Sequence, residues 1–290
     1  MTQAAGVTVV AEGLAFPEGP IAMPDGSVIL VEIERGTLTR VLPDGRNEVI
    51  AECGGGPNGA AFGPDGRVWL CNNGGRDAHG CIQAVSLETG EVETVYETVE
   101  GHRLSAPNDL VFDATGGFWF TDHGSTWERT RDHGGLYYAT ADGREVREVV
   151  YPLEAPNGVG LSPGDERVYV AETHTGRVRS FDITAPGELA LRFGKETRGR
   201  LLGTVSGEQL LDSLAVDSSD RVCVATIRSG GITAFDQDGV STFVPTGDRI
   251  TTNICFGGED MRTAYITGSR DGTLLKLAWP VAGHRLHFNP

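Results

Sequence analysis

The sequence predicts an all-β fold, a six-bladed β-propeller formed by residues 1–290 as a single domain. A short phrase recurs six times along the chain, and an oxygen-bearing side chain holds the same place in each copy. Two short apolar runs joined by a turn follow each copy, and the copies are 40 to 55 residues apart. Repeats of this length with strand–turn–strand content are typical of propellers and solenoids. The recurring residues, here called the axial residues, are Glu18, Asn58, Asn108, Asn157, Asp212 and Asn253.

Each repeat is expected to begin with a hairpin of two short strands rich in β-branched and aromatic residues. The expected pairs are Ala60–Phe62 with Val68–Leu70, Leu110–Phe112 with Phe118–Phe120, Val159–Leu161 with Val168–Val170, and Leu214–Val216 with Val222–Ala225. The turn between the two strands is usually Pro-Asp-Gly-like, as at Pro64-Asp65-Gly66 in the first of these pairs. The 41 glycines and 14 prolines spread along the chain fit many such turns. Trp119 lies at a position in the alternating pattern of its strand that is typical of a core residue.

Two further strands complete each blade, as at Gly135–Ala139 and Val146–Val150 in the third repeat. Four strands in each of six blades give a propeller, in which radial repetition limits the exposed sheet edges. The first repeat starts late, so we expect residues Val7–Val10 to complete the last blade and close the ring.

Three longer connections, Asn72–Gly80, Asp122–Gly134 and Ala185–Gly199, are expected to be surface loops. Long connections without a strand pattern often form lids or binding loops. The first two follow the second strand of a repeat, so we expect them at the face opposite the axial residues, or at the rim, unless they fold back.

Composition excludes several classes of partner. The formal net charge is −16, from 24 Lys and Arg against 40 Asp and Glu, and such a surface repels nucleic acid and anionic membranes. No apolar run is long enough for a transmembrane helix, and residues 1–6 do not resemble a secretory signal. Five cysteines without Cys-x-x-Cys spacing fit reduced thiols, with a Cys71–Cys81 bridge as the alternative. We therefore expect a cytoplasmic protein. The oligomeric state stays open.

The axial residues predict a cation site, because equivalent positions of successive blades converge on the central axis. All six carry side-chain oxygen, and none is His or Cys. Oxygen ligands select calcium, magnesium or manganese over zinc or copper. Two carboxylates, Glu18 and Asp212, would neutralise a divalent cation. The alternative is that the asparagines only form strand-entry turns. We predict one divalent cation, calcium first, with magnesium, manganese or zinc as alternatives.

The same phrases resemble those of the SMP-30/gluconolactonase/luciferin-regenerating family. The resemblance rests on the motifs Phe16-Pro17-Glu18-Gly19-Pro20, Ala106-Pro107-Asn108-Asp109, Ala155-Pro156-Asn157-Gly158 and Thr252-Asn253-Ile254-Cys255-Phe256-Gly257-Gly258, and it extends over essentially the whole chain. It implies a six-bladed propeller with one catalytic divalent cation, usually calcium, in the central tunnel. The family's ligands map onto Glu18, Asn157 and Asp212, and Asn108 is a ligand in some relatives and a substrate contact in others.

The sequence departs from this resemblance at Ala106. In the sugar-lactonase branch an arginine at this place holds substrate hydroxyls. We therefore expect a metal-dependent hydrolase that opens a lactone or related cyclic ester other than a highly polar aldonolactone. The alternatives are phosphotriester hydrolysis, a lyase or isomerase step at the same metal site, or a non-catalytic ligand-binding propeller.

Hydrolysis also needs a base that takes a proton from the attacking water. The resemblance makes Asp212 the first candidate. Asp109 is the second, and its alternative role is to support Asn108. For substrate contacts we predict Asn58, His123, Trp127, His174, Arg228 and Asn253. His123, His174 and Arg228 follow a second strand at matching points of three repeats, but each is equally a candidate for an ordinary loop or surface residue.

Overall fold

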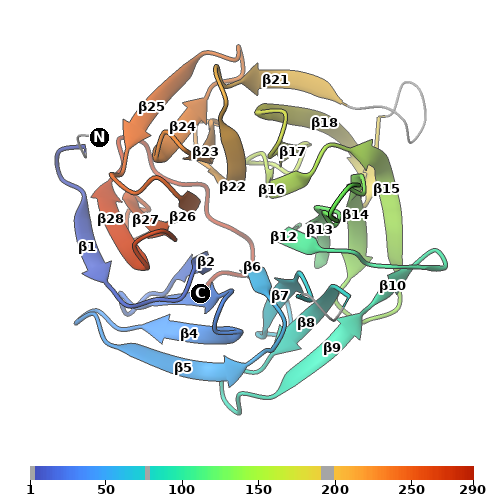
Figure 1. The fold of residues 1–290 in the computed structure, drawn as a ribbon, viewed down its shortest axis with the longest axis horizontal. Helices are drawn as coiled ribbons and strands as arrows, with labels where there is room; N and C mark the ends of the chain where they lie inside the picture. Colours follow the sequence, from blue (N-terminus) through green and yellow to red (C-terminus); the bar gives the residue numbers. More distant parts are fainter. Residues whose placement is uncertain (1–3, 76–78, 191–198) are drawn as a thin grey trace.

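Six antiparallel sheets surround a central axis in the structure, a computed structural model that describes residues 4–75, 79–190 and 199–290 (Figure 1). Each sheet has four or five strands, and its strands follow one another outward from the axis. A separate two-stranded ladder joins β10 (Thr98–Val99) to β11 (His102–Arg103). The predicted all-β propeller with six blades is therefore confirmed.

The first strand of each blade lies nearest the axis. Each of these inner strands packs against the inner strands of the two neighbouring blades, and the ring closes where β26 meets β2. The inner strands are β2 (Pro17–Ala22), β6 (Pro57–Phe62), β12 (Pro107–Phe112), β16 (Pro156–Leu161), β22 (Leu210–Val216) and β26 (Thr251–Gly257). Each contains one axial residue, so the six repeats do bring these residues to one axis.

The remaining strands of each blade lead outward to the rim. The second strands are β3 (Val28–Glu32), β7 (Val68–Asn72), β13 (Gly117–Asp122), β17 (Arg167–Glu172), β23 (Val222–Ile227) and β27 (Thr263–Gly268). The third strands are β4 (Thr37–Val41), β8 (Cys81–Val85), β14 (Gly134–Thr140), β18 (Arg177–Ala185), β24 (Gly231–Phe235) and β28 (Thr273–Ala278). The outer strands are β5 (Asn47–Glu52), β9 (Val92–Tyr96), β15 (Val146–Leu153), β21 (Arg200–Thr204), β25 (Ser241–Pro245) and β1 (Thr8–Ala11). A short strand β19 (Glu188–Leu189) also pairs with β18.

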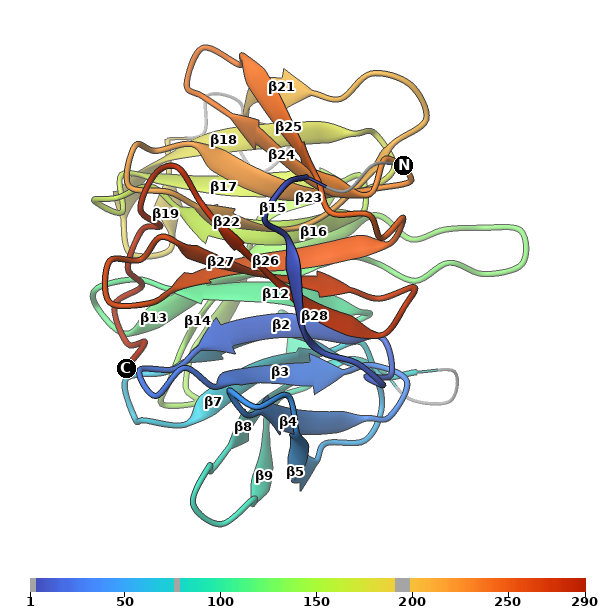
Figure 2. The ribbon, with the colours of Figure 1, turned by 90° about the vertical axis from the view of Figure 1, so that its left-hand side faces the viewer.

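The N-terminal strand closes the ring. β1 pairs antiparallel with β28, so the last blade takes three strands from the C-terminal end of the chain and one from the N-terminal end. Figure 2 shows β1 crossing the side of the molecule to reach this blade. The expectation that residues near Val7–Val10 complete the last blade is confirmed.

The apolar cores lie between neighbouring blades. One cluster joins Trp69 of β7 to Phe112, Phe118 and Phe120 of the next blade. The Trp69 and Phe112 rings meet edge to face, with their centroids 5.9 Å apart. Large aromatic side chains contribute most to such cores, because each buries a large apolar surface. Trp119 is fully buried, as its place in the sequence predicts.

The two loops that follow β7 and β13 begin at the same face as the axial residues. Pro57 pairs with Asn72, and Pro107 pairs with Asp122, so the end of each second strand adjoins the start of its inner strand. The expectation that these loops lie at the opposite face was wrong, because neighbouring strands run antiparallel. Parts of the predicted loops, 76–78 and 191–198, lie outside the described residues.

After β28 the C-terminal segment, residues 279–290, crosses the far end of the propeller. Its Gly283 forms a bridge with Asp217 after β22, and the Phe288 ring meets the Phe112 ring at 5.9 Å. Figure 1 shows the segment passing over the centre of the ring. The sequence pattern gave no expectation for this segment.

All five cysteine thiols are free in the structure, so no Cys71–Cys81 bridge is present. Within the described ranges, no helix is both long and apolar enough to cross a membrane.

Candidate active site

A break in strand pairing marks the position of the axial residue in every blade. The register of the inner strand shifts between Glu18 and Ile21 in β2, between Pro107 and Leu110 in β12, and between Leu211 and Leu214 in β22. The other three inner strands show the same shift next to Asn58, Asn157 and Asn253. Bulges of this kind bend a strand and redirect a side chain. The repeated bulge thus sets the axial residues apart from the regular ladder.

Glycines beside three axial residues let the inner strands approach closely at the axis. A Cβ atom on Gly59 would lie 2.5 Å from Asp109 Oδ1, and one on Gly158 would lie 2.6 Å from the backbone nitrogen of Leu214. Gly19 has a φ of +51°, and its Cβ would lie 2.5 Å from the carbonyl oxygen of Asn58. Such approaches are possible only without a side chain.

Three carboxyl groups are buried together around the axis. Glu18, Asp109 and Asp212 are each less than a tenth exposed. Burial and the negative charge of Asp212 raise the pKa of Glu18 well above its usual range. Burial raises the pKa of Asp109 to about 7. Burial, together with the charge of Asp109, raises the pKa of Asp212 to about 7. Close, buried carboxylates disfavour one another's ionisation, and a cation between them reverses that effect.

Amide oxygens of the axial asparagines complete this group. Asn58 Oδ1 and Asn108 Oδ1 are buried and have no hydrogen-bond partner within the described residues. A buried polar atom without a partner costs about 1–3 kcal/mol, so two in one place call for a ligand or water. Among the described residues, Asn157 Oδ1 accepts one long hydrogen bond, from Ser213 Oγ at 3.4 Å.

Asn253 differs from the other axial asparagines. Its Oδ1 accepts a hydrogen bond from the backbone nitrogen of Ile254 at 2.8 Å, and its Nδ2 donates to Glu18 Oε2 at 2.8 Å. The amide therefore orients the Glu18 carboxylate rather than offering an oxygen to the axis. Asn253 was predicted outside the ligand set as a substrate contact, and that role stays a prediction.

The donor set fits a divalent cation that prefers oxygen. In the part of the chain that the structure describes, no three His, Cys, Asp or Glu side chains are placed to hold a metal, so a site here depends on amide oxygens. Carboxylate and amide oxygens together suit calcium better than zinc. The residues that would hold the ion are the predicted set, Glu18, Asn108, Asn157 and Asp212. The structure adds Asn58, because its oxygen is as unpaired as that of Asn108.

Asp109 lies beside the axis but is committed to the backbone. Its Oδ1 accepts a hydrogen bond from Leu110 N at 2.9 Å, and its Oδ2 accepts one from Val159 N in the next blade at 3.3 Å. These contacts tie β12 to β16 next to Asn108 and Asn157. Of the two roles considered for Asp109, the geometry favours support of the neighbouring axial residues.

Polar residues that end the second strands hold the chain just before the axial residues. Glu32 accepts from Ala15 N at 2.7 Å, Asn72 from Gly56 N at 2.9 Å, and Glu172 from Glu154 N at 3.1 Å. These positioning residues were not predicted from the sequence. A signal was present, because in each of these blades a polar residue follows the axial residue by 14 or 15 positions.

Asp122 plays this part for Asn108 and binds three backbone amides, Ser105 N at 2.6 Å, Ala106 N at 2.8 Å and Gly124 N at 3.0 Å. Replacing Asp122 with alanine should lower the free energy of unfolding by about 3 kcal/mol or more, because it leaves three amides without an acceptor. It should also lower kcat/KM by displacing Asn108. Urea unfolding and steady-state kinetics would measure the two effects.

Asp142→Ala is the matched control, because Asp142 accepts from Arg144 N in an exposed turn far from the axis. We expect that variant to stay within about 1 kcal/mol of the parent. Equal stability losses for the two variants would contradict a special role for Asp122.

The face at which the inner strands begin and the second strands end is here called the entrance face. The predicted substrate contacts on this face are only partly brought together. The His123 and His174 rings lie 5.7 Å apart at matching strand ends, and burial lowers the pKa of both. Trp127 is 59% exposed, and its Nε1 donates to Asp132 Oδ2 at 3.2 Å. Arg228 lies at the exposed end of β23 and pairs with Glu208 at 2.8 Å. Because Arg228 is paired with Glu208 at the surface, it fits the role of a substrate contact least well among the predicted residues.

A broad cavity of about 1360 Å³ opens on this face above the second and third blades. Ala106, His123 and Trp127 line it, together with Tyr151 and residues of the loop after β7. His123 and Trp127 were predicted to contact substrate. Both line this cavity together with the small side chain of Ala106. The cavity therefore begins beside the inner strand that carries Asn108.

Comparison with known proteins gives consistent matches. Residues 16–270 match the family model described as SMP-30/Gluconolactonase/LRE-like region. A protein named lactonase drp35 from Staphylococcus saprophyticus is 28% identical over 230 residues, which are 79% of this chain and 67% of that protein. A protein named gluconolactonase from Zymomonas mobilis is 26% identical over 295 residues, with 91% of this chain and 79% of that protein covered.

Solved structures show the same fold. A calcium-binding protein described as regucalcin from Agrobacterium tumefaciens superposes with a TM-score of 0.78 over 100% of both chains at 18% identity. The names of the relatives bear out the prediction of a lactonase-like hydrolase. Because the family model spans most of the chain, the protein belongs to the SMP-30/gluconolactonase/LRE-like family, as its axial motifs predict.

Proposed function

We propose that this protein hydrolyses a lactone or a related cyclic ester with the help of one divalent cation, calcium first, on the propeller axis. The observation that carries the proposal is the group of buried carboxyls and unpaired amide oxygens at the bulges of the inner strands. A propeller without a catalytic role gains nothing from burying Glu18, Asp109 and Asp212 together, since their mutual repulsion costs stability. Relatives named as lactonases support the reaction class.

When bound, the cation would neutralise the carboxylates and polarise the ester carbonyl as a Lewis acid. Glu18, Asn108, Asn157 and Asp212 would hold it. Asn253 keeps the Glu18 carboxylate in place through its Nδ2 hydrogen bond. Asp109 holds β12 against β16, so that Asn108 and Asn157 keep their separation.

Asp212 is the proposed base. A carboxylate has two oxygens, so one can face the ion while the other accepts the proton of the attacking water. Asp212 is 8% exposed and Asp109 is 7% exposed, so burial does not separate the two candidates. Asp109 is less suited, because its two oxygens already accept backbone hydrogen bonds.

The wall beside Asn108 favours a substrate with an apolar body. Ala106 offers no hydrogen bond from its side chain, and its backbone nitrogen is already bound to Asp122 Oδ1 at 2.8 Å. A substrate hydroxyl that loses water there without a new partner costs about 1–3 kcal/mol. Trp127 provides an aromatic surface at the edge of the same cavity.

We expect kcat/KM for dihydrocoumarin to exceed that for gluconolactone, and we expect galactonolactone to be poor as well. The reason is the missing polar partner at Ala106 combined with the apolar surface of Trp127. The measurement compares these lactones in one buffer with added calcium, beside an aryl ester and a phosphotriester.

Two variants make this comparison sharper. Trp127→Ala should raise KM for dihydrocoumarin by roughly tenfold through the loss of apolar contact, and should change KM for a small lactone without a ring substituent far less. Ala106→Arg should reduce the ratio of kcat/KM for dihydrocoumarin to kcat/KM for gluconolactone, because it restores a hydrogen-bond donor. A kcat/KM for gluconolactone that is tenfold or more above that for dihydrocoumarin in the parent protein would contradict this specificity. Turnover of the phosphotriester alone would contradict the lactonase proposal itself.

A further inference from the structure

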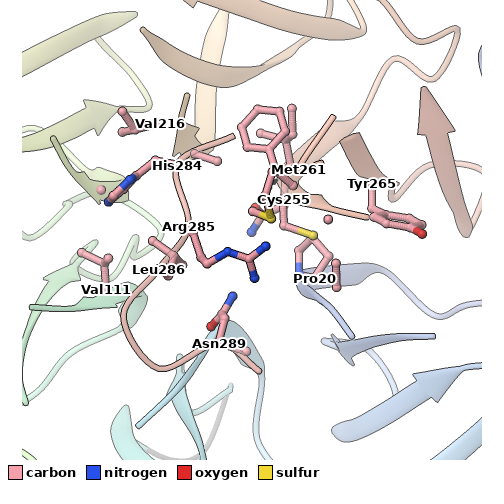
Figure 3. Close-up of a pocket in the computed structure, with 18 of the residues that line it drawn as sticks. Pro20, Val111, Val216, Cys255, Met261, Tyr265, His284, Arg285, Leu286 and Asn289 are labelled. Carbon is pink, nitrogen blue, oxygen red and sulfur yellow. Dashed lines mark hydrogen bonds between the residues drawn. The ribbon is translucent and has the colours of Figure 1, made fainter. Parts of the chain in front are cut away.

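A second cavity, here called the rear chamber, lies on the axis at the end away from the entrance face. Its volume is about 440 Å³, within the range of small-molecule sites. Val111, Leu161 and Val216 line it, and each follows the axial residue of its inner strand. The C-terminal segment supplies another part of the wall through His284, Arg285, Leu286 and Asn289 (Figure 3).

The walls of the rear chamber are mainly apolar and partly adaptable. Besides the three inner-strand residues above, Phe256 lines it. So do Met23 and Met261, two of the three methionines of the chain. Methionine side chains adjust to ligands of different shape, because they are unbranched and polarisable. Such walls fit a ligand with a flexible or aromatic apolar body.

Arg285 places one positive charge at this chamber. Figure 3 shows its guanidinium reaching from the C-terminal segment toward the space between Asn289, Pro20 and Met261. Arg285 forms no ion pair or hydrogen bond with any described residue, although the protein carries a formal net charge of −16. Its side chain is exposed, so it stands at the opening of the chamber.

The neighbours of Arg285 are anchored, which gives the guanidinium a defined place. His284 N donates to Val216 O at 2.9 Å, and Gly283 N donates to Met261 O at 2.7 Å. Beyond it, His287 Nε2 lies 2.8 Å from Asp165 Oδ2, and Phe288 packs against Phe112. The segment that presents Arg285 is therefore held on both sides, and this reduces the entropy cost of binding.

The opposite wall of the chamber determines how a ligand would lie. Asp109 and Asn253 line the chamber at the level of the axial residues. Both oxygens of Asp109 accept backbone hydrogen bonds, so this wall is polar and acidic. Without a cation on the axis, an anionic group is repelled there, and with or without the cation it is attracted at Arg285. The apolar body then lies between them, against Val111, Leu161 and Val216.

We propose that the rear chamber binds a small amphipathic carboxylate, with its carboxylate on Arg285 and its apolar body on the chamber walls. Guanidinium and carboxylate match in geometry and form paired hydrogen bonds. Two sources supply this chemistry. One is a free medium-chain fatty acid, and the other is the hydroxy acid released when an aromatic lactone opens.

The test is titration calorimetry on the full chain with octanoate, with 3-(2-hydroxyphenyl)propanoate, and with octan-1-ol as the neutral comparison. Each is measured with calcium and with chelator, because a carboxylate could also reach a metal on the axis. We expect octanoate to bind in both conditions. Tighter binding of the hydroxyphenyl acid than of octanoate would identify the ring-opened product as the source, and the reverse would identify the fatty acid.

Arg285→Gln should weaken binding of the carboxylates about tenfold and leave octan-1-ol binding nearly unchanged. Arg285→Lys should recover part of the affinity. Arg144→Gln is the matched control, because Arg144 is exposed in an outer turn with its side chain 85% accessible. Octanoate should also protect Arg285, and not Arg144, from an arginine-specific dicarbonyl reagent read by mass spectrometry.

Three results would overturn the proposal. They are no binding of either carboxylate at millimolar concentration, equal affinities in the parent and Arg285→Gln, and binding that disappears with chelator. None of these measurements uses lactone turnover, so they are independent of the proposed reaction.

Discussion

Replacing Asp212 with asparagine is expected to lower kcat for lactone hydrolysis by roughly 100-fold or more while the propeller stays folded. The substitution keeps a side-chain oxygen for the cation but removes the group that accepts the proton. Asp212→Ala should abolish activity, because it removes the oxygen as well. Steady-state kinetics with saturating calcium, and calcium titration of each variant, separate the two effects.

The structure sharpens this test through Asp109. Burial raises the pKa of both Asp109 and Asp212 to about 7, so either could act as a base on that ground alone. Geometry distinguishes them, because Asp109 oxygens are occupied by Leu110 N and Val159 N. Asp109→Asn should therefore clearly lower the free energy of unfolding, while its effect on kcat per folded molecule should be small. Near-normal turnover by Asp212→Asn would assign the base to Asp109 or His123 instead.

Removing the divalent cation is expected to abolish turnover and to give the protein an unusual dependence of stability on pH. Asp109 and Asp212 have pKa values of about 7 in the folded protein, against an ordinary value of 3.8. Raised carboxyl pKa values mean that the folded state holds more protons than the unfolded state between those limits. Stability is then greatest at the acidic end of this window and falls as the pH rises through 7.

Thermal unfolding in chelator should accordingly give a higher Tm at pH 5.5 than at pH 8. Added calcium should raise Tm most at pH 8, because the ion replaces the protons between the carboxylates. Asp212→Asn, which removes one of these groups, should flatten the curve in chelator. Full activity after exhaustive chelation, or a Tm in chelator that rises with pH, would contradict a cation site on the axis.

The repeated phrases were enough to predict the blades, because each blade depends on local signals. An apolar run, a turn rich in Gly and Asp, and a second apolar run specify a hairpin without reference to distant residues. The position of Glu18, Asn108, Asn157 and Asp212 on the axis then follows from the repetition alone. The bulges beside them were not predicted, since nothing in a single repeat marks where a strand leaves its ladder.

Two features required the three-dimensional structure for a different reason. The spacing after the axial residue marks the place of Asp122 in the sequence, but its role depends on which backbone amides of the loop before Asn108 lie near it, and the spacing does not show that. The path of residues 279–290 is set by contacts with Val216, Asp165 and Phe112, which are far away in sequence. Such contacts leave no periodic signal in the sequence. The face on which the loops after β7 and β13 lie likewise became clear only from the antiparallel pairing of the strands.

Closure of the ring by β1 and β28 has a consequence for how the protein is made. The hydrogen bond from Thr8 to Lys276 joins residues 268 positions apart, and Asn253 meets Glu18 across 235 positions. Hairpins of the early blades can form while the ribosome is still adding the later ones. Glu18, however, can accept the hydrogen bond from Asn253 only after nearly the whole chain has emerged. Each nascent polypeptide would thus complete the proposed cation site in one late event. A prematurely terminated translation product would contain most of the blades and no functional centre.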